Sequence, residues 1–576
     1  MRDITMQGDI MISRYFVHFR APKRAAINGG GAMSGSTHEV TNQTPVLGDY
    51  NLYTSDTALQ EGVRREGAQW DEQALSHYGF RLGLKESFAL AHDANRYGPE
   101  LEGFDRQGRR VDRVNFHPDW HRFMRMAFLQ GMHCSPWAAP QPGAHVARAA
   151  AYLMHGQVEA GSLCPVTMTA AAIPVLQKEP WFDSVAGHLY SLQYDDRDMP
   201  LSGKTSMMIG MGMTEKQGGS DLRSNTTQAT PADAAGTAWH LLGHKWFFSS
   251  PMSDAHLVLA RHEDDYSCFY VPRWLDDGSR NAVHIQRIKN KLGNRSNASV
   301  EVEFHNAIGV PVGEQGRGIA VLVEMASYTR LDCVLGSTAL LRQAVVQAMH
   351  HARHRMAFGA PLMRQPLMQT VLMDLVLESE AAIALALRLA RAFDPSGDPL
   401  DLAVRRILTP AAKFWVCKRS IEAVGECMEI LGGNGYIEDG PMARLYREAP
   451  VNSIWEGSGN VMCLDVLRAI RRHPEHAQAL WAALEEDSAD EPVLREHAGR
   501  LLGLLSASGP DLESAGRYIA QELVLLTQAN LLRRHAPRVL SDAFIQTRFG
   551  GTAGRVYGAI ASPVALYSVL ERAWPE

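Results

Sequence analysis

The feature that most constrains this chain is a long stretch, Ile319–Ala357, that has helical periodicity and contains no proline. Globular helices usually span about 8–20 residues, so a stretch this long needs other helices along its sides. Three more helical stretches follow, at Pro366–Phe393, at Leu402–Leu431 with a kink expected at Pro410, and after Gly459. Together they predict a four-helix bundle.

The chain before the bundle shows two different periodicities. From about Thr54 to Tyr190 the spacing is helical, most clearly in Ser76–Asn95 and Ala144–Val158. From Thr205 short β-rich runs recur at intervals of roughly ten residues, which is typical of a small barrel or sandwich. The runs are Ser206–Met213, Trp239–Phe248, His256–Ala260, Tyr266–Pro272, Val283–Arg287 and Val300–His305.

The expected fold class is therefore α+β, and 576 residues are too many for a single core. We predict a helical N-terminal domain (46–204), a middle β-domain (205–317), a helical bundle (318–472) and a further helical domain (473–576). Residues 1–45 differ in composition from the rest, and we expect a disordered extension. Met33 is one candidate start of the protein; a transit peptide is the alternative, which Asp3 and Asp9 disfavour.

Composition places the chain among ordinary globular proteins, with 45% hydrophobic and 21% charged residues. A net charge of −6 gives no overall positive field, so any nucleic-acid site must be local. The seven cysteines are scattered and form no Cys-x-x-Cys pair, which predicts reduced core thiols in a cytoplasmic protein and no metal site. No apolar run reaches the length of a membrane span. His350 and His354 share a helix face, a pattern more typical of solvated or packed side chains than of metal ligands.

Chemistry concentrates in the stretch Arg444–Arg468, RLYREAPVNSIWEGSGNVMCLDVLR. Glu456 stands after Trp455 and before a glycine-rich run that lets the backbone approach a flat ligand. A carboxylate between an aromatic ring and an open loop is partly desolvated, so its pKa should rise toward that of a useful general base. Taken alone, these residues also fit an ordinary polar loop between two helices.

Two further stretches complete a pattern: MGMTEKQGGSD at Met211–Asp221 and LGGNGY at Leu431–Tyr436. With Glu456 before its Gly-Ser pair, they resemble the acyl-CoA dehydrogenase family of flavoproteins. GHKWFFS, KLGNRSNAS and PVNSIWEGSGN are similar to its AidB-like branch, adaptive-response flavoproteins that also bind DNA. The resemblance implies the acyl-CoA dehydrogenase fold, FAD as cofactor, and an acyl-CoA or similar hydrophobic molecule as substrate.

The same resemblance implies which residues hold FAD. Met213 and Thr214 would meet the flavin ring, and Ser220 would lie near the pyrophosphate. Phe247–Ser249 stands where the family usually has Trp-x-Thr, so an aromatic ring there would pack against the flavin. The implied cofactor-binding residues are Met211, Met213, Thr214, Gly219, Ser220, Phe247, Phe248, Ser249, Arg355, Phe358, Gln365, Gly432, Gly433, Ile454, Ser458 and Asn460.

The stretch from His354 to Gly359 resembles the family's Arg-x-x-Phe-Gly motif. In this motif Arg355 would reach the FAD pyrophosphate of a neighbouring subunit, with Gln365 as its companion. The resemblance therefore implies a homo-oligomer, commonly a tetramer. Glu429 departs from the family, which often has glutamine there, and a carboxylate does not suit a pyrophosphate.

The reaction that the resemblance implies is α,β-dehydrogenation of an acyl thioester such as isovaleryl-CoA. Glu456 would be the catalytic base and Arg330 its electrostatic partner. Some relatives carry the base beside an arginine on the long bundle helix. The matching residue here is Thr329, which cannot act as that base.

The candidate DNA site lies near the C-terminus. Between Arg517 and Arg572 there are seven arginines and three acidic residues, and arginine suits phosphate oxygens. The AidB resemblance implies non-specific binding of double-stranded DNA, although the acidic stretch Glu485–Glu496 opposes it. The candidate DNA-binding residues are Arg468, Arg517, Arg533, Arg534, Arg538 and Arg548.

Two functions fit these features. The first is an AidB-like flavoprotein that binds DNA, is linked to protection against DNA alkylation and has weak dehydrogenase activity. The alternative is a metabolic FAD-dependent acyl-CoA dehydrogenase without a DNA role. The C-terminal extension and the aromatic residues Trp246–Phe248 and Trp455 favour the first.

Overall fold

The computed structural model describes residues 37–505, 510–551, 554–560 and 566–574. The predicted disorder of 1–45 falls mostly outside the described residues. Residues 37–43, the described part of a separate N-terminal unit, contain no helix or strand. From Thr44 onward the chain forms one compact unit. In its described part no helix combines the length and the apolar character needed to cross a membrane.

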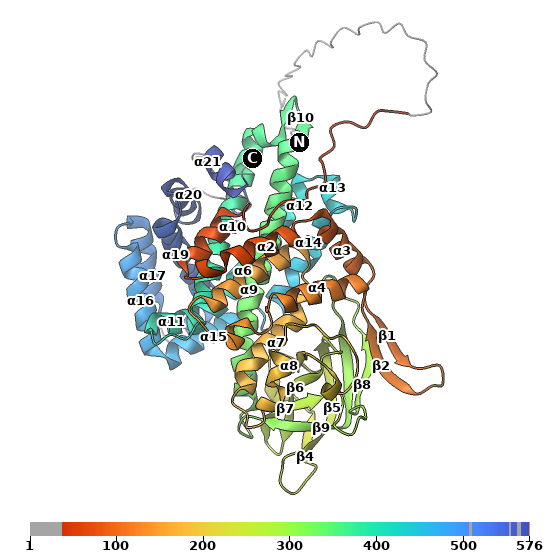
Figure 1. Cartoon of the computed structure of the whole chain (residues 1–576). Helices are drawn as coiled ribbons and strands as arrows, with labels where there is room; N and C mark the ends of the chain where they lie inside the picture. Colours follow the sequence, from red (N-terminus) through yellow and green to blue (C-terminus); the bar gives the residue numbers. More distant parts are fainter. Residues whose placement is uncertain (1–36, 506–509, 552–553, 561–565, 575–576) are drawn as a thin grey trace, which may run out of the picture. The chain divides into compact units, whose positions relative to one another are not determined.

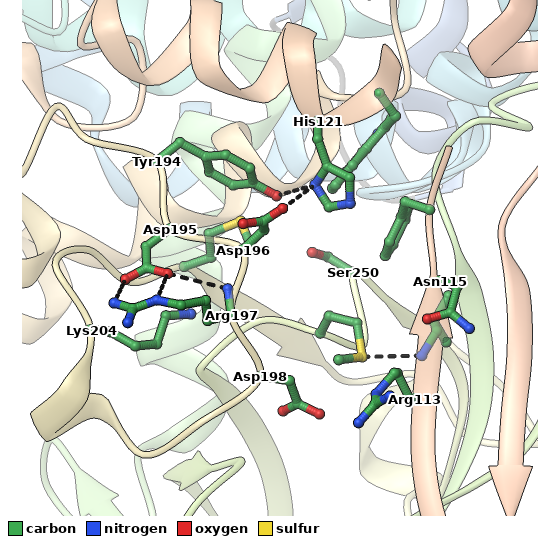
Figure 2. Close-up of a pocket in the computed structure, with 15 residues that line it drawn as sticks. Arg113, Asn115, His121, Tyr194, Asp195, Asp196, Arg197, Asp198, Lys204 and Ser250 are labelled. Atoms are coloured by element: carbon green, nitrogen blue, oxygen red, sulfur yellow. Dashed lines mark hydrogen bonds and ion pairs between the residues drawn. The ribbon is translucent and has the colours of Figure 1, made fainter. Parts of the chain in front are cut away.

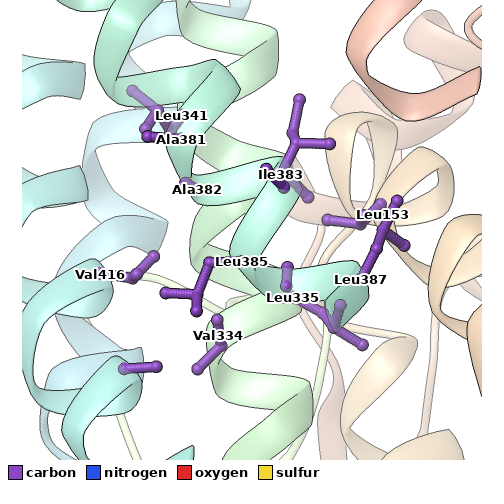
Figure 3. Close-up of a cluster of buried hydrophobic side chains, with 14 of the residues drawn as sticks. Leu153, Val334, Leu335, Leu341, Ala381, Ala382, Ile383, Leu385, Leu387 and Val416 are labelled. Atoms are coloured by element: carbon purple, nitrogen blue, oxygen red, sulfur yellow. The ribbon is translucent and has the colours of Figure 1, made fainter. Parts of the chain in front are cut away.

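The predicted bundle is present and is organised around α9 (Gly318–His354). This helix packs along α10 (Pro366–Arg391) and α12 (Thr409–Ile430), and α15 (Gly459–Arg472) packs on α12 (Figure 1). Leucine and valine side chains from these helices and from the N-terminal region interlock in a common core (Figure 3). Representative members are Leu153, Leu335, Leu385, Leu387 and Val416, all at most 3% exposed.

The expected kink at Pro410 takes a specific form. A π-helical turn, Val404–Leu408, joins the short α11 (Pro399–Ala403) to α12. Pro410 then occupies the first turn of α12, where its missing N–H leaves no hydrogen bond broken.

The N-terminal helices are α1 (Thr57–Arg65), α2 (Glu72–Leu82), α3 (Lys85–Arg96), α4 (Pro118–Leu129), α5 (Ser135–Ala138), α6 (Ala144–Val158), α7 (Leu163–Leu176) and α8 (Asp183–Leu189). Of these helices, α6 and α7 pack on α9. The single helix predicted at Ser76–Asn95 is two helices, broken at Gly83. A Cβ on Gly83 would lie 1.6 Å from the Tyr50 carbonyl oxygen, so the chain crosses here at a distance that only glycine permits.

The middle region is a closed β-barrel, one of the two predicted forms. Strands β6, β4, β5, β9 and β7 pair in that order, and β7 pairs with β6 to complete the ring. The bounds are β3 (Ile209–Gly212), β4 (Gln228–Pro231), β5 (Trp239–Ser249), β6 (Ala255–His262), β7 (Asp265–Pro272), β8 (Val283–Ile288) and β9 (Ser299–Val312). The prediction missed β4 and the hairpin of β1 (Glu100–Phe104) and β2 (Arg110–Asn115), which are short and mostly polar.

The C-terminal extension packs directly on the bundle. Its central helix, α19 (Gly516–His535), contacts α10, α12 and α15. The other elements here are α16 (Pro474–Ser488), α17 (Pro492–Leu505), α18 (Pro510–Ser514), α20 (Arg538–Arg548) and α21 (Leu566–Ala573). Short connecting elements are β10 (Met356–Ala357), β11 (Ala360–Pro361), α13 (Gly433–Tyr436), α14 (Pro441–Glu448) and the 3₁₀ turns Gln69–Asp71, Leu201–Gly203, Leu222–Ser224, Leu362–Arg364 and Ala449–Ser453.

Candidate active site

Glu456 lies in a tight turn between a 3₁₀ turn and α15. Its backbone adopts φ +58, and Gly457 follows with φ +101. A Cβ on Gly457 would lie 2.5 Å from the Met462 side chain, so this position requires glycine. A non-glycine residue with positive φ stores strain, and such strain is common at functional sites. The turn therefore directs the Glu456 carboxylate toward α9.

Three side chains hold this turn against the bundle. The Thr329 hydroxyl donates to the Glu456 carboxylate at 2.6 Å, and Arg330 Nε donates to the Glu456 carbonyl at 3.2 Å. Lys413, from α12, donates to the Gly457 carbonyl at 2.7 Å. Thr329, which cannot be a base itself, therefore orients the base.

The carboxylate has the character of a general base. Burial raises the pKa of Glu456 above its ordinary value, against the opposing effects of the Thr329 hydrogen bond and the nearby charges of Lys413 and Arg330. A carboxylate whose pKa is raised accepts a proton more readily than a solvated glutamate.

Arg330 acts on Glu456 both through its charge, which lowers the pKa of Glu456, and through the hydrogen bond to the Glu456 carbonyl. Its guanidinium also pairs with Asp465 at 2.8 Å, and Arg406 binds the same carboxylate with two nitrogens, each at 2.9 Å. Arg330 is only 9% exposed, so it also holds the catalytic turn in place. The catalytic role of Arg330 as electrostatic partner stays a prediction.

The loop after β3 forms the neighbouring wall. Asn225 donates to the Met213 carbonyl at 2.8 Å, and the Trp246 amide donates to the Thr214 carbonyl at 2.8 Å. A Cβ on Gly219 would lie 2.6 Å from the Thr214 hydroxyl, which explains the glycine. Met211 is buried at the end of β3, and Ser220 is exposed.

A buried ion pair that the sequence analysis did not single out anchors this loop. Glu215 and Lys245 are 2.7 Å apart and both side chains are fully buried. Thr226 and Thr227 also donate to the Glu215 carboxylate. Burial acts to raise the pKa of Glu215, but Lys245 and the hydrogen bonds prevail and lower it to about 2. Both residues stand inside the quoted motifs, so the signal was present in the sequence.

Phe247 and Phe248, the two phenylalanines of β5, lie in different surroundings. Phe247 is 50% exposed and Ser249 is half-buried. Phe248 is 2% exposed and stacks on His256 at 3.8 Å inside the barrel core. The prediction that Phe248 contacts the cofactor is therefore wrong, because successive strand residues point to opposite faces.

A second group of predicted residues lines a cavity of about 310 Å³ at the far end of α12. Arg355, Gly432 and Gly433 meet here. Glu429, the residue that departs from the family pattern, also lines the cavity. Gln365 donates to the Ala357 carbonyl at 3.1 Å and is absent from the lining. Phe358, at the tip of the β10–β11 hairpin, is 98% exposed.

Another cavity, of about 390 Å³, lies between α4, β2 and the loop before β3 (Figure 2). Its charged groups largely neutralise one another or pair with residues behind the lining. Arg197 binds Asp195 with two nitrogens, and Asp198 pairs with Arg273. None of the predicted site residues lines it.

The remaining predicted cofactor residues flank the Glu456 turn. Ile454 is 64% exposed and Ser458 is exposed. The Asn460 side chain accepts a hydrogen bond from Arg517 at 2.9 Å. Arg517, a predicted DNA contact, is therefore tied to the catalytic turn.

The other predicted DNA contacts are dispersed. Arg548 is buried and pairs with Asp374 at 2.6 Å and Glu378 at 3.0 Å, so its prediction as a DNA contact is wrong. Arg533 donates to the Asp487 carbonyl at 2.8 Å, and Arg534 pairs with the Asp487 carboxylate. The side chains of Arg538 and Arg468 remain 92% and 56% exposed.

Two groups of histidines lie close together in the structure. His350 and His354 each bond a backbone carbonyl oxygen, at 2.8 Å. Among the described residues, the one set whose ligand atoms converge within 4.8 Å is His473, Glu475 and His476, near the start of α16. All seven cysteines are buried and free, as the sequence predicted.

Three family profiles match the chain in order. They are the adaptive response protein AidB N-terminal domain at residues 42–196, the acyl-CoA dehydrogenase middle domain at 210–307 and the acyl-CoA dehydrogenase C-terminal domain at 316–471. The AidB protein of Escherichia coli (strain K12), named as an acyl-CoA dehydrogenase, is 48% identical over 517 residues, which cover 89% of this chain and 95% of that protein. Acyl-CoA dehydrogenase family member 11 of Caenorhabditis elegans is 29% identical and covers 84% of each chain.

Solved structures share the fold. The protein Bd2924 in its apo form is 27% identical with a TM-score of 0.78, covering 86% of this chain and all (100%) of that one. ACDH-11 of C. elegans, solved in complex with C11-CoA, has a TM-score of 0.79 at 24% identity and covers 93% of each chain. The ordered match of all three domains and the 48% identity to AidB lead to one conclusion. The chain belongs to the acyl-CoA dehydrogenase family of FAD-dependent oxidoreductases, in its AidB-like branch.

Proposed function

We propose that this protein dehydrogenates acyl thioesters and that Glu456 is the base that removes the α-proton. The observation that carries the proposal is the Glu456 carboxylate itself. It is held by Thr329, its backbone is strained, and burial raises its pKa. The complex of ACDH-11 with C11-CoA supports a thioester as the substrate class.

The residues present fit a flavin. Phe247 offers an exposed aromatic surface, Ser249 a hydroxyl and the Met211–Ser220 loop a tight backbone edge. The Arg355 cavity, with two glycines, offers a guanidinium to phosphate oxygens, and the Glu429 carboxylate in the same lining opposes that contact. We propose that these residues hold FAD, together with Met211, Met213, Thr214, Gly219, Ser220, Ile454, Ser458 and Asn460. When bound, the flavin supplies the acceptor for the hydride that leaves the β-carbon.

The proton step belongs to the protein. Glu456 takes the proton from the α-carbon while the electron pair of that C–H bond forms the new double bond. Thr329 keeps the carboxylate oriented, and Arg330 and Lys413 fix the turn that carries it. Proton transfer depends on the position of the carboxylate relative to the substrate. Small displacements of the turn should therefore slow the reaction.

The test is Glu456→Gln, which keeps the shape and removes the basicity. Bleaching of the flavin by isovaleryl-CoA should slow by about 10²–10⁴-fold, the usual contribution of a general base, while FAD content stays the same. Bleaching at the wild-type rate would show that another group is the base. Absence of bleaching in the wild type would favour a role outside metabolism.

We also propose that the FAD site is shared between subunits of a homo-oligomer, which requires at least a dimer, and that this oligomer is a tetramer. Lys413, which touches the catalytic turn, and Ile430, beside the Arg355 cavity, lie 17 positions apart on α12, so about 26 Å separates them at 1.5 Å per residue. Phe358, 98% exposed beside this cavity, suits a subunit contact.

Mixed oligomers test the shared site. Glu456→Gln and Arg355→Ala subunits are each defective, but a mixed interface combines an intact Glu456 with an intact Arg355 from the other subunit. Co-expression should therefore restore measurable dehydrogenase activity. If both residues act within one chain, the mixture has no intact site and stays inactive.

A DNA role is the second candidate function, supported by the 48% identity to AidB. We propose that exposed arginines, chiefly Arg538, Arg534 and Arg468, bind double-stranded DNA through its phosphates without sequence specificity, in protection against alkylation. The dispersal of the other arginines predicts modest affinity. The seven free thiols fit the reducing cytoplasm, where we propose that the protein works.

A gel shift over a range of salt concentrations tests this role. Each phosphate contact contributes about −0.9 to the slope of log K against log salt, so Arg534→Ala with Arg538→Ala should flatten the slope. FAD content should stay unchanged. A wild-type protein that does not shift DNA would leave the metabolic dehydrogenase as the function.

A further inference from the structure

Lys291 is the first residue of the segment KLGNRSNAS, and it has no role in the proposed function. Its ammonium donates to the Asn297 carbonyl at 2.6 Å, to the Ser299 hydroxyl at 3.2 Å and to the Asn294 side-chain oxygen at 3.5 Å. In the described part of the chain no carboxylate lies within 4.0 Å of this ammonium. Burial lowers the pKa of Lys291 to about 8, and the charge of Glu448, which acts from a longer distance, opposes this shift.

The segment around Lys291 is rigid. Asn294 adopts φ +53, and its amide donates to the Glu448 carboxylate at 2.8 Å. A Cβ on Gly293 would lie 2.1 Å from the Arg447 carbonyl oxygen, so the segment lies close against the end of α14. This packing holds the backbone that carries Lys291, and the three hydrogen bonds described above hold its ammonium.

A chain of hydroxyls leads from Lys291 to the proposed flavin site. Ser299 and Ser249 have their hydroxyl oxygens 2.9 Å apart. An ammonium can only donate, so Ser299 accepts from Lys291 and its own proton is available to donate to Ser249. When Ser299 donates to Ser249, the proton of Ser249 can donate beyond this pair. Lys291 supports this arrangement because it occupies one acceptor position of Ser299.

The Cys164 thiol, on α7, is part of the same buried polar surroundings. Burial raises the pKa of Cys164 to about 11; Lys291 opposes the rise, Glu456 adds to it, and hydrogen bonds with Asn297 and Ser249 oppose it.

We propose that Lys291 is a positioning residue that, through Ser299, turns the Ser249 hydroxyl toward the flavin edge as a donor, and whose buried charge favours the reduced flavin. The proposal rests on the flavin lying at Ser249, as argued above. Reduction adds negative charge to the ring, so a fixed positive charge nearby stabilises the reduced form. An ammonium is costly to bury, and an anionic reduced ring offsets part of that cost.

The test measures the flavin reduction potential in the FAD-loaded protein without substrate. Lys291→Met removes the charge and keeps the length of the side chain. At a fixed solution potential, its ratio of reduced to oxidised flavin should fall about tenfold, which for two electrons equals a shift of about 30 mV toward more negative potential. Lys291→Arg should stay close to the wild type. Lys85→Met, at an exposed lysine, makes the same change in net charge and should have no effect.

Ser299→Ala separates the hydroxyl chain from the charge. It should weaken FAD binding and alter the fine structure of the flavin spectrum, with a smaller change in potential than Lys291→Met. A wild-type reduction potential in Lys291→Met would overturn the proposal. If that variant does not hold FAD, wild-type FAD affinity and a wild-type flavin spectrum in Ser299→Ala would overturn it. Because no substrate is present, these results do not depend on whether Glu456 is the catalytic base.

Discussion

At the scale of single residues, the site depends on a few groups held in unusual states. Glu456 combines positive φ with a carboxylate whose pKa is raised by burial. Thr329 moderates that rise by donating a hydrogen bond to the ionised form. The base is therefore set by a balance between desolvation and one hydroxyl, and changing either should move its titration.

The pH profile of flavin reduction tests this balance. Because the base must be ionised, the rate should fall as pH drops through the pKa of Glu456, at a higher pH than for an ordinary glutamate of about 4.3. Thr329→Val removes the stabilising donor and should move the fall to still higher pH. Thr338→Val, a matched change on the same helix whose hydroxyl bonds only the Val334 carbonyl, should leave the profile in place.

Gly457 offers a test of the backbone. Gly457→Ala should destabilise the catalytic turn, because φ +101 disfavours a side chain and the new Cβ meets Met462. The cost should exceed about 1 kcal/mol and slow flavin reduction. Gly187→Ala, with open space around it on α8, is the control. Equal melting temperatures and rates for the two variants would contradict this account.

At the scale of elements, the barrel supplies one wall of the site through the loop after β3. The loop is anchored by the buried Glu215–Lys245 pair and two threonines. A buried pair is expensive to break, because removing one partner leaves an uncompensated charge. The pair therefore fixes the loop geometry more than it adds to net stability.

Lys245→Met should destabilise the protein by about 3–5 kcal/mol, because it leaves the Glu215 carboxylate buried and unpaired. Adding Glu215→Gln should recover part of the loss, which a thermal melt would detect. The sign with pH follows from the low pKa of Glu215, about 2. Its contribution is complete above the ordinary glutamate pKa and is lost as pH falls toward 2. Melting temperatures of the double variant no higher than those of the single one would argue against this mechanism.

At the scale of the whole molecule, the C-terminal extension is part of the bundle's core. α19 packs on α10, α12 and α15, and Arg548 on α20 binds Asp374 and Glu378 of α10. Arg572 similarly binds Glu61 and Glu380. Many of the arginines that gave this segment its positive charge thus join it to the rest of the chain.

Two single variants separate structural from surface arginines. Arg548→Met should lower the melting temperature, since it removes the ion pair of Asp374 and leaves Glu378 paired only with Arg419. Arg538→Ala, at a side chain 92% exposed, should leave stability unchanged and weaken DNA binding if DNA binds there. A large loss of stability in Arg538→Ala, or none in Arg548→Met, would reverse this assignment.

Periodicity in the sequence determined the order of the three regions. The spacing of apolar residues predicted α9, α10 and α12 closely, because long helices with buried faces carry a strong signal. The strands β5, β6 and β7 followed from the regular spacing of short β-rich runs. The break at Gly83 and the strand β4 were missed, because a close chain crossing and a short polar strand leave little trace in local pattern.

The motifs in the sequence also determined where the chemistry lies, at Glu456 and in the loops around it. Only the tertiary structure decided which neighbours act on that carboxylate, that Phe248 faces the barrel core, and that Arg330 and Arg548 are held by acidic partners. Such contacts join residues more than a hundred positions apart, as between Thr329 and Glu456. A local pattern records which residues are polar or apolar, but the partner that neutralises or orients each one is set by how the helices and strands pack.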